Sequence, residues 1–131
     1  VFANEPELAA LGETLEVALA APSRRGGGLL AAKLGARGSQ LFGAVRCAVP
    51  AFPVAACDTT GCGDAFAAGF VVARLRGAAP EVAARLGNAA GALVATRPGA
   101  AEALPTRADV RALLAAHAAQ AELDVLAIGE E

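Results

Sequence analysis

The chain has 131 residues, of which 56% are hydrophobic, so it can bury enough apolar surface to fold and is not predicted to be disordered. Its net charge of −2 and its scattered arginines do not favour a nucleic-acid partner. No uncharged apolar run reaches the ~18 residues of a membrane span, and no signal peptide opens the sequence. Three cysteines without a C-x-x-C pair are typical of a reducing cytoplasm, where we expect the protein. The sequence contains no methionine, so we expect either an alternative start codon or a chain cut from a longer one.

Turn residues and apolar runs define the elements expected in the first half of the chain. Asn4 is expected to cap a short helix over 6–11, and a second helix is expected over 13–21. An apolar run over 29–34 after a glycine-rich loop is typical of a buried parallel strand. A β-hairpin is expected next, over 39–49.

The second half of the sequence has mainly helical patterns. We expect a helix over 65–76, a helix beginning at Pro80, and a last helix that begins at Thr106, where Asp109 completes a capping box. The apolar run over 124–129 predicts one more short buried strand. Strands that alternate with helices indicate an α/β fold with a mostly parallel sheet.

The residues Gly61-Cys62-Gly63-Asp64 carry the strongest chemical signal, because they stand where a helix is expected to begin. Glycines allow a ligand to approach the backbone, and the first N–H groups of a helix lack internal partners beside the positive end of its dipole. Such a site suits a phosphoryl group, and the Asp64 carboxylate could take a proton from an attacking hydroxyl. The alternative is a glycine-rich turn followed by an ordinary first-turn acid.

The residues around this tetrapeptide resemble a known family signature. Asp58-Thr59-Thr60 precede it and Ala65-Phe66-Ala67-Ala68-Gly69-Phe70 follow it, which is similar to the C-terminal signature of the ribokinase/PfkB family of carbohydrate kinases. The resemblance implies that Asp64 is the catalytic base and that the backbone of Gly61, Cys62 and Gly63 forms the anion hole. The family more often has alanine where Cys62 stands, and we expect a passive small residue rather than a low-pKa thiol.

The same resemblance suggests two cation sites. Asn4-Glu5-Pro6-Glu7 looks like the Asn-x-x-Glu motif of the family, which implies that Asn4 and Glu7 help to hold Mg²⁺ and its waters. A helix cap followed by a first-turn acid explains these residues equally well. Asp58 and Thr60 match family positions near a monovalent cation, usually K⁺, although Asp58 could also be a structural turn residue.

Two further segments resemble the nucleotide site of the family. Lys33-Leu34-Gly35-Ala36-Arg37-Gly38 follows the apolar strand and is similar to the Gly-x-x-Gly turn that contacts ATP. The resemblance places Lys33, Gly35, Arg37 and Gly38 beside the phosphates and ribose, whereas the alternative is a plain strand-to-hairpin turn. Asn88 lies in a segment whose counterpart borders the adenine, where it could bond the base or cap a neighbouring turn.

The resemblance also predicts how the chain is organised. Residues 1–121 match the C-terminal, nucleotide-binding and catalytic half of the family domain, with an incomplete three-layer α/β/α fold of the ribokinase-like type. Residues 122–131 look like the opening strand of the same domain, through tandem domains, a permuted arrangement or coincidence. We therefore expect either a homo-oligomer or an N-terminal half supplied from elsewhere.

The expected reaction is ATP-dependent phosphorylation of a hydroxyl on a sugar or related small molecule, with Mg²⁺ at the phosphates. One alternative is a non-catalytic nucleotide-binding or interaction module, since half a domain would leave a sheet edge and an apolar face exposed. A related vitamin-precursor kinase is the other alternative, although the residues Asp58-Thr59-Thr60 before the glycine turn favour sugar kinases.

Overall fold

A computed structural model describes residues 1–10, 17, 28–99 and 104–128 of the chain. The helix expected over 13–21 lies outside these residues except for Val17, which is helical. Gly129, at the end of the expected tail strand, also lies outside them. No helix in the described part is long and apolar enough to cross a bilayer.

The described sheet has four strands in the order β1-β2-β3-β4: Phe2–Asn4, Leu30–Lys33, Ser39–Phe42 and Cys47–Val49. β1 pairs with β2 in parallel, whereas the β2–β3 and β3–β4 pairs are antiparallel. Within the described residues the sheet is thus mixed rather than mostly parallel. The reason is that β2, β3 and β4 follow one another through short turns, and strands joined by short turns pair antiparallel. β1 was not predicted from the sequence, because its three residues show no alternating pattern and form a strand only through their pairing with β2.

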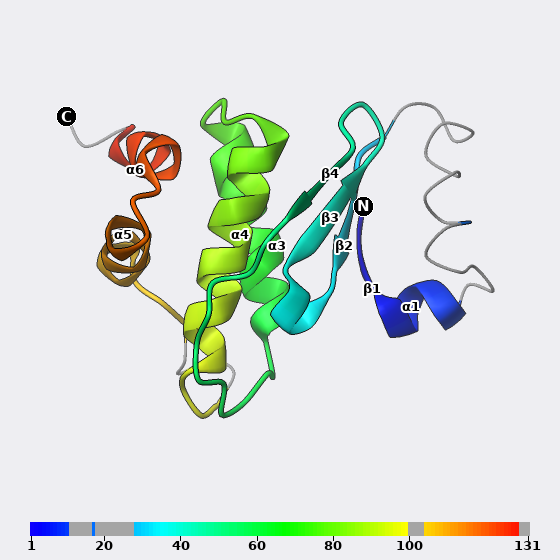
Figure 1. Ribbon diagram of the computed structural model, residues 1–131, viewed down its shortest axis with the longest axis horizontal. Helices are drawn as coiled ribbons and strands as arrows, with labels where there is room; N and C mark the ends of the chain where they lie inside the picture. Colours follow the sequence, from blue (N-terminus) through cyan, green and yellow to red (C-terminus); the bar gives the residue numbers. More distant parts are fainter. Residues whose placement is uncertain (11–16, 18–27, 100–103, 129–131) are drawn as a thin grey trace.

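Helices cover both faces of this sheet, as Figure 1 shows. α3 and α4 lie against one face, α5 and α6 pack on the outer side of α4, and α1 lies on the other side of the sheet. This arrangement confirms the expected α/β fold with helical layers around a sheet. The elements are α1 (Glu5–Ala10), the 3-10 helix η2 (Gly35–Arg37), α3 (Cys62–Leu75), α4 (Pro80–Ala95), α5 (Arg107–Ala116) and α6 (Gln120–Ala127).

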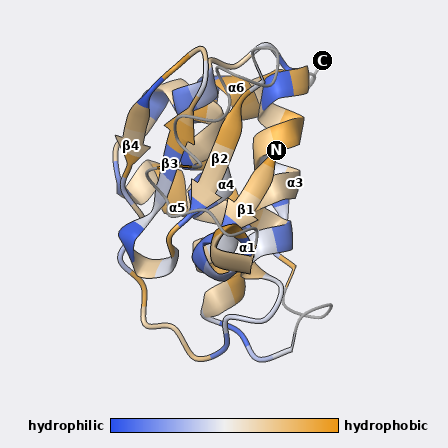
Figure 2. Cartoon of the chain, turned by 90° about the vertical axis from the view of Figure 1, so that its right-hand side faces the viewer, coloured by the Kyte–Doolittle hydropathy of each residue, from blue (hydrophilic) through white to orange (hydrophobic). Residues whose placement is uncertain are grey.

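Alternation along β2 and β3 produces one apolar core on each face of the sheet. Ala31 and Leu41 face the helices α3 and α4 in the larger core. Leu30, Ala32 and Phe42 point the other way and pack against Leu8 of α1. Apolar residues accordingly run along β1 and β2 in the view of Figure 2.

Glycines bring α3 and α4 into close contact, which fixes where α3 begins. A Cβ at Gly87 would lie 2.8 Å from the Phe66 ring, and a Cβ at Gly91 would lie 3.1 Å from the Cys62 carbonyl oxygen. Phe66 also contacts Phe2 of β1 edge-on, with the ring centroids 6.1 Å apart. The first turn of α3 is therefore held between the sheet and α4.

The strand expected over 124–129 is wrong, because this segment lies in helix α6 as far as Ala127. A short apolar run does not distinguish a strand from a buried helix by its periodicity. Here the helix buries Leu126 in the larger core, and Gln120 bonds Asp124 one turn later at 2.7 Å. Arg76, the residue that follows α3, also donates to the Val125 carbonyl oxygen at 3.5 Å.

Candidate functional site

A cavity of about 420 Å³ opens beyond the carboxyl end of β2, where ligands commonly bind in open α/β sheets. Its walls come from the turn at 35–38, the extended segment 51–56, the beginning of α3 and one face of α4. Of the residues predicted for the site, Asn4, Lys33, Gly35, Gly38, Cys62, Gly63 and Asn88 line it.

The beginning of α3 leaves backbone donors unused beside this cavity. Gly61 precedes the helix with φ 80°, a left-handed conformation that favours glycine, and no side chain caps the helix. The Cys62 N–H donates to the Thr59 carbonyl oxygen at 3.2 Å. The N–H groups of Gly63 and Asp64 find no backbone acceptor among the described residues. These donors and the helix dipole favour an anion at this point.

The Lys33 side chain reaches the same point from the end of β2. Its Nζ atom lies 2.9 Å from where a Cβ on Gly63 would be, so the ammonium stands directly over the first turn of α3. A mobile positive charge, two free N–H groups and the positive end of a helix dipole thus converge. This is the arrangement expected for a phosphate site.

Asp64 lies in the first turn of α3, next to Gly63, and its side chain is exposed. Its carboxylate makes no hydrogen bond or ion pair within the described part of the chain. It is not among the residues that line the cavity. The carboxylate is therefore open to a molecule that approaches from outside the cavity.

Cys62 lies at the first position of α3 without the features of an activated thiol. Burial and the nearby charge of Asp58 raise the pKa of the Cys62 thiol. A thiol with a raised pKa stays neutral near pH 7 and is a weak nucleophile. The raised pKa argues against an activated thiol, and the passive role of Cys62 stays a prediction.

Asn4 and Glu7 form a reciprocal helix cap at the start of α1. The Glu7 N–H donates to Asn4 Oδ1 at 2.8 Å, and the Asn4 N–H donates to Glu7 Oε2 at 2.7 Å. The capping alternative is thus observed. Amide and carboxylate oxygens are also suitable for Mg²⁺, which commonly keeps its waters, so an outer-sphere ion would leave the cap intact. No cluster of three or more His, Cys, Asp or Glu side chains able to hold a metal directly occurs among the described residues.

Asp58 ties the loop before α3 to the residues that follow α4. Its Oδ1 accepts the Thr60 N–H at 2.9 Å, and its Oδ2 accepts the Gly99 N–H at 3.2 Å. The bonds from Thr60, and then the one from Gly99, hold the pKa of the Asp58 carboxyl below its usual value. The structural turn role is therefore observed for Asp58, and its role toward a monovalent cation stays a prediction.

Two residues predicted to contact the nucleotide make structural contacts, and their roles toward a nucleotide stay predictions. The Asn88 amide donates to the Val49 and Pro50 carbonyl oxygens at 3.1 and 3.0 Å, so it fixes the end of β4. The Arg37 guanidinium donates to Glu5 at 2.6 Å, and this bond raises the pKa of Arg37. The sequence could not reveal these partners, which lie more than thirty residues away along the chain in both cases.

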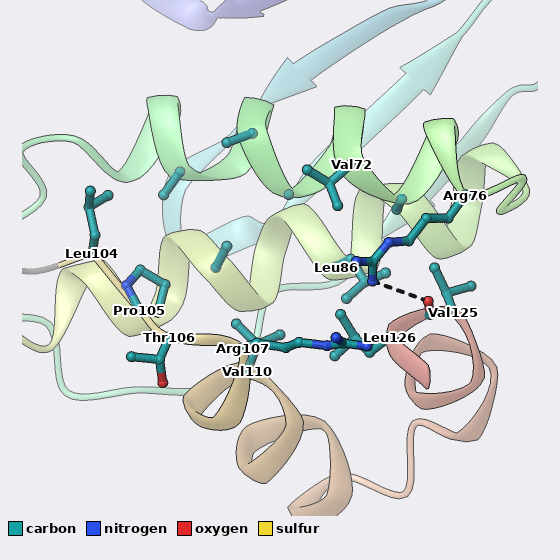
Figure 3. A pocket seen from close by; sticks show the side chains of 15 residues that line it. Val72, Arg76, Leu86, Leu104, Pro105, Thr106, Arg107, Val110, Val125 and Leu126 are labelled. Atoms are coloured by element: carbon teal, nitrogen blue, oxygen red, sulfur yellow. Dashed lines mark hydrogen bonds between the residues drawn. The ribbon is translucent and has the colours of Figure 1, made fainter. Parts of the chain in front are cut away.

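Two parts of the cavity wall were not predicted from the sequence, the segment 51–56 with Phe52 and the residue Gly87. The signal available was Pro50 and Pro53, which keep the residues between them extended. A second cavity of about 370 Å³ lies among α3, α4, α5 and α6 (Figure 3). It contains none of the residues predicted for the site.

A glycine turn after a buried strand and an uncapped helix N-terminus beside Lys33 are features that suit an α/β domain for nucleotide phosphates. Residues 1–107 match the model of the pfkB family of carbohydrate kinases, and the chain belongs to this family. The expected family and the expected ribokinase-like fold are thereby confirmed.

Individual relatives agree with this assignment. The chain is 42% identical over 115 residues to the ATP-dependent ribose-1-phosphate kinase of Halopiger xanaduensis, covering 87% of this chain and 38% of that protein. It resembles the crystal structure of Thermotoga maritima ribokinase with a TM-score of 0.82 and 38% identity, covering 87% of this chain and 41% of that one. The structure of Arabidopsis thaliana ribokinase complexed with ribose and ATP matches with a TM-score of 0.74 and 35% identity, over 86% of this chain and 39% of that one. The chain thus spans about two fifths of the length of these relatives.

Proposed function

We propose that the chain is the nucleotide-binding and catalytic part of an ATP-dependent kinase that phosphorylates a hydroxyl of a sugar or related small molecule. The observation that carries this proposal is the position of Lys33 Nζ over Gly63 at the N-terminus of α3, beside the larger cavity. Two of its relatives, an ATP-dependent ribose-1-phosphate kinase and a ribokinase complexed with ribose and ATP, support the substrate class.

The nucleotide would lie with its base and ribose in the slot between the 35–38 turn, the 51–56 segment and α4. Its phosphates would then extend toward the N-terminus of α3. Lys33 and the N–H groups of Gly63 and Asp64 would stabilise the charge on the transferring group. Asn4 and Glu7 would hold Mg²⁺ through its waters, and the ion would neutralise phosphate charge.

Asp64 is the proposed general base. The acceptor hydroxyl gives its proton to the Asp64 carboxylate while its oxygen forms a bond to the γ-phosphorus, and the bond from that phosphorus to the bridging oxygen breaks. The products are the phosphorylated acceptor and ADP. The exposed, unpartnered carboxylate supports this role, because an acceptor can reach it from the side opposite the nucleotide. We further propose K⁺ near Asp58 and Thr60, where it would stabilise the loop before α3.

A non-catalytic nucleotide-binding module is the second candidate. It is favoured by one observation, that Asp64 is not among the residues that line the cavity. Such a module would bind ATP without transferring its phosphoryl group. The two candidates therefore differ in turnover and not in nucleotide affinity.

The deciding experiment compares Asp64→Asn with the wild-type chain. Calorimetry measures the dissociation constant of ATP, and a coupled assay measures ADP formation with ribose and ribose 1-phosphate. We expect Asp64→Asn to lose nearly all turnover and to retain ATP binding, since the amide keeps the shape but cannot accept the proton. Glu81→Gln is a matched control, because Glu81 is likewise a first-turn acid, at the start of α4.

Each other outcome has a definite meaning. Equal turnover in Asp64→Asn and wild type would contradict the assignment of the base. ATP binding by the wild type without turnover on either sugar would favour the non-catalytic module. Absence of ATP binding would contradict both candidates.

A further inference from the structure

The Phe52 ring is a wall of the larger cavity and is 4% exposed. It belongs to the extended segment after β4, which has no backbone ladder to hold it in place. Its position must therefore come from side chains of other elements. Two side chains supply ring contacts, one from α4 and one from the residue that follows α5.

The Arg85 guanidinium lies over the Phe52 ring, with its Cζ 5.0 Å from the ring centroid. His117 contacts the same ring edge-on, with the two ring centroids 5.0 Å apart and the planes at 88°. A cation over an aromatic face is attractive by electrostatics, and more so when the pair is shielded from water. The Arg85 side chain is 30% exposed, so this pair is largely shielded.

Arg85 is itself held by a carboxylate from α6. Glu122 Oε1 lies 3.5 Å from Arg85 Nε, and the Glu122 side chain is only 8% exposed. A buried carboxylate without its cation is costly, so Glu122 strongly favours the position of Arg85 beside it. α6 lies beyond residues 1–107, over which the chain matches the family.

Arg85 and Asn88 lie three residues apart on α4, a spacing that places both on one face of the helix. Asn88 bonds the carbonyl oxygens of Val49 and Pro50, immediately before the segment that carries Phe52. One face of α4 thus makes two contacts with this cavity wall. Asn88 holds the backbone just before the wall, and Arg85 contacts the Phe52 ring within it.

We propose that Arg85, locked by the buried Glu122 of α6, is a positioning residue that sets the affinity of the cavity for the nucleoside part of ATP through Phe52. This inference rests on the proposed function, since it takes ATP as the occupant of the cavity. Arg85 touches the ring and not the ligand, so it acts through Phe52.

The test measures two dissociation constants by calorimetry on the full chain, one for ATP and one for inorganic tripolyphosphate. Arg85→Met keeps the length of the side chain and removes the charge, and we expect ATP binding to weaken about three- to tenfold. Tripolyphosphate binding should be unchanged, because that probe has no nucleoside part and meets only Lys33 and the N-terminus of α3. Glu122→Gln should weaken ATP binding by a smaller factor, and Arg85→Lys should restore most of the affinity lost in Arg85→Met.

Arg46→Met is the matched control, because Arg46 lies over the Phe42 ring at 5.7 Å and Phe42 does not line the cavity. Phenylalanine-specific ¹³C labelling adds a readout that does not depend on a ligand, as the chain has only 5 phenylalanines. We expect the Phe52 ring signals to shift and broaden in Arg85→Met and to stay in place in Arg46→Met.

Several results would overturn the proposal. Unchanged Phe52 signals in Arg85→Met would show that Arg85 does not position the ring. Equal weakening of ATP and tripolyphosphate would show general loss of structure instead of positioning. If the wild type bound tripolyphosphate but not ATP, the nucleoside would not occupy the cavity, and the proposed function and this inference would both fail. An effect of Arg85→Met on neither ligand, with wild-type ATP binding intact, would overturn this inference alone.

Discussion

Gly63→Ala tests whether the Lys33 ammonium holds a phosphate at the N-terminus of α3. The new Cβ would lie 2.9 Å from Lys33 Nζ and 3.6 Å from its Cδ and Cε atoms. The crowded atom is the end of a flexible side chain, so Lys33 can move aside without disturbing the backbone. Alanine is also more favourable than glycine within a helix by about 0.5–1 kcal/mol, so the melting temperature should not fall.

The effect on binding follows from the displacement of that charge. If the ammonium moves from about 4 Å to about 5–6 Å from a phosphate charge, the attraction falls from about 4 to about 3 kcal/mol at an effective dielectric constant of about 20. A loss of about 1 kcal/mol corresponds to roughly fivefold weaker binding. We therefore expect the dissociation constant of ATP to rise about fivefold in Gly63→Ala at low salt.

Calorimetry at low and at high ionic strength provides the measurement, because salt screens the contribution of Lys33. The difference between Gly63→Ala and the wild type should shrink as salt is added. Gly28→Ala is the control, since a Cβ there would meet nothing within 4 Å. In Lys33→Gln the further change Gly63→Ala should have little effect, because the charge is already absent. Equal ATP affinity of Gly63→Ala and wild type, with an unchanged melting temperature, would refute the assigned phosphate contact.

Two further predictions concern the loops around the site. Gly38 has φ 90° and a Cβ there would lie 2.1 Å from the Val49 carbonyl oxygen, so Gly38→Ala combines backbone strain with a clash against backbone. We expect it to lower the free energy of unfolding by at least about 3 kcal/mol, and an unchanged urea midpoint would contradict this. The bonds from Thr60 and Gly99 lower the pKa of Asp58 in the folded state, so their stabilisation is present above about pH 4 and is lost as pH falls through the folded pKa. Asp58→Ala should therefore reduce stability at pH 7 and flatten its decline below about pH 4, as urea titrations at several pH values would show.

Local signals in the sequence predicted most helices correctly. Pro80 begins α4 as expected, and Thr106 with Asp109 forms the capping box at the start of α5. These features act over one helical turn, so they can be recognised without knowing the fold. The hairpin was predicted for the same reason, because the turn and both strands are adjacent in sequence. α3 begins at Cys62, three residues before the expected start at Ala65.

Elements and contacts that depend on distant partners were not predictable in the same way. β1 exists because Phe2, Ala3 and Asn4 pair with Ala31, Ala32 and Lys33, nearly thirty residues away. The tail run that was expected to form a strand belongs to helix α6. Leu126 of this helix packs into the larger core, and Glu122 in its first turn pairs with Arg85 of α4. Neither partner can be inferred from the residues of the run itself.

The sequence by itself determined the family, the positions of α3 to α5, and the residues of the proposed anion site, since glycines at a helix start have a physical meaning wherever the chain folds. Tertiary structure alone decided which charges serve that site. It brought Lys33 over Gly63 and paired Arg37 with Glu5, although the two cations lie only four residues apart. The reason is that a strand end and the following turn point long side chains in different directions, and only the packing of β2 against α3 and α1 determines what each one meets.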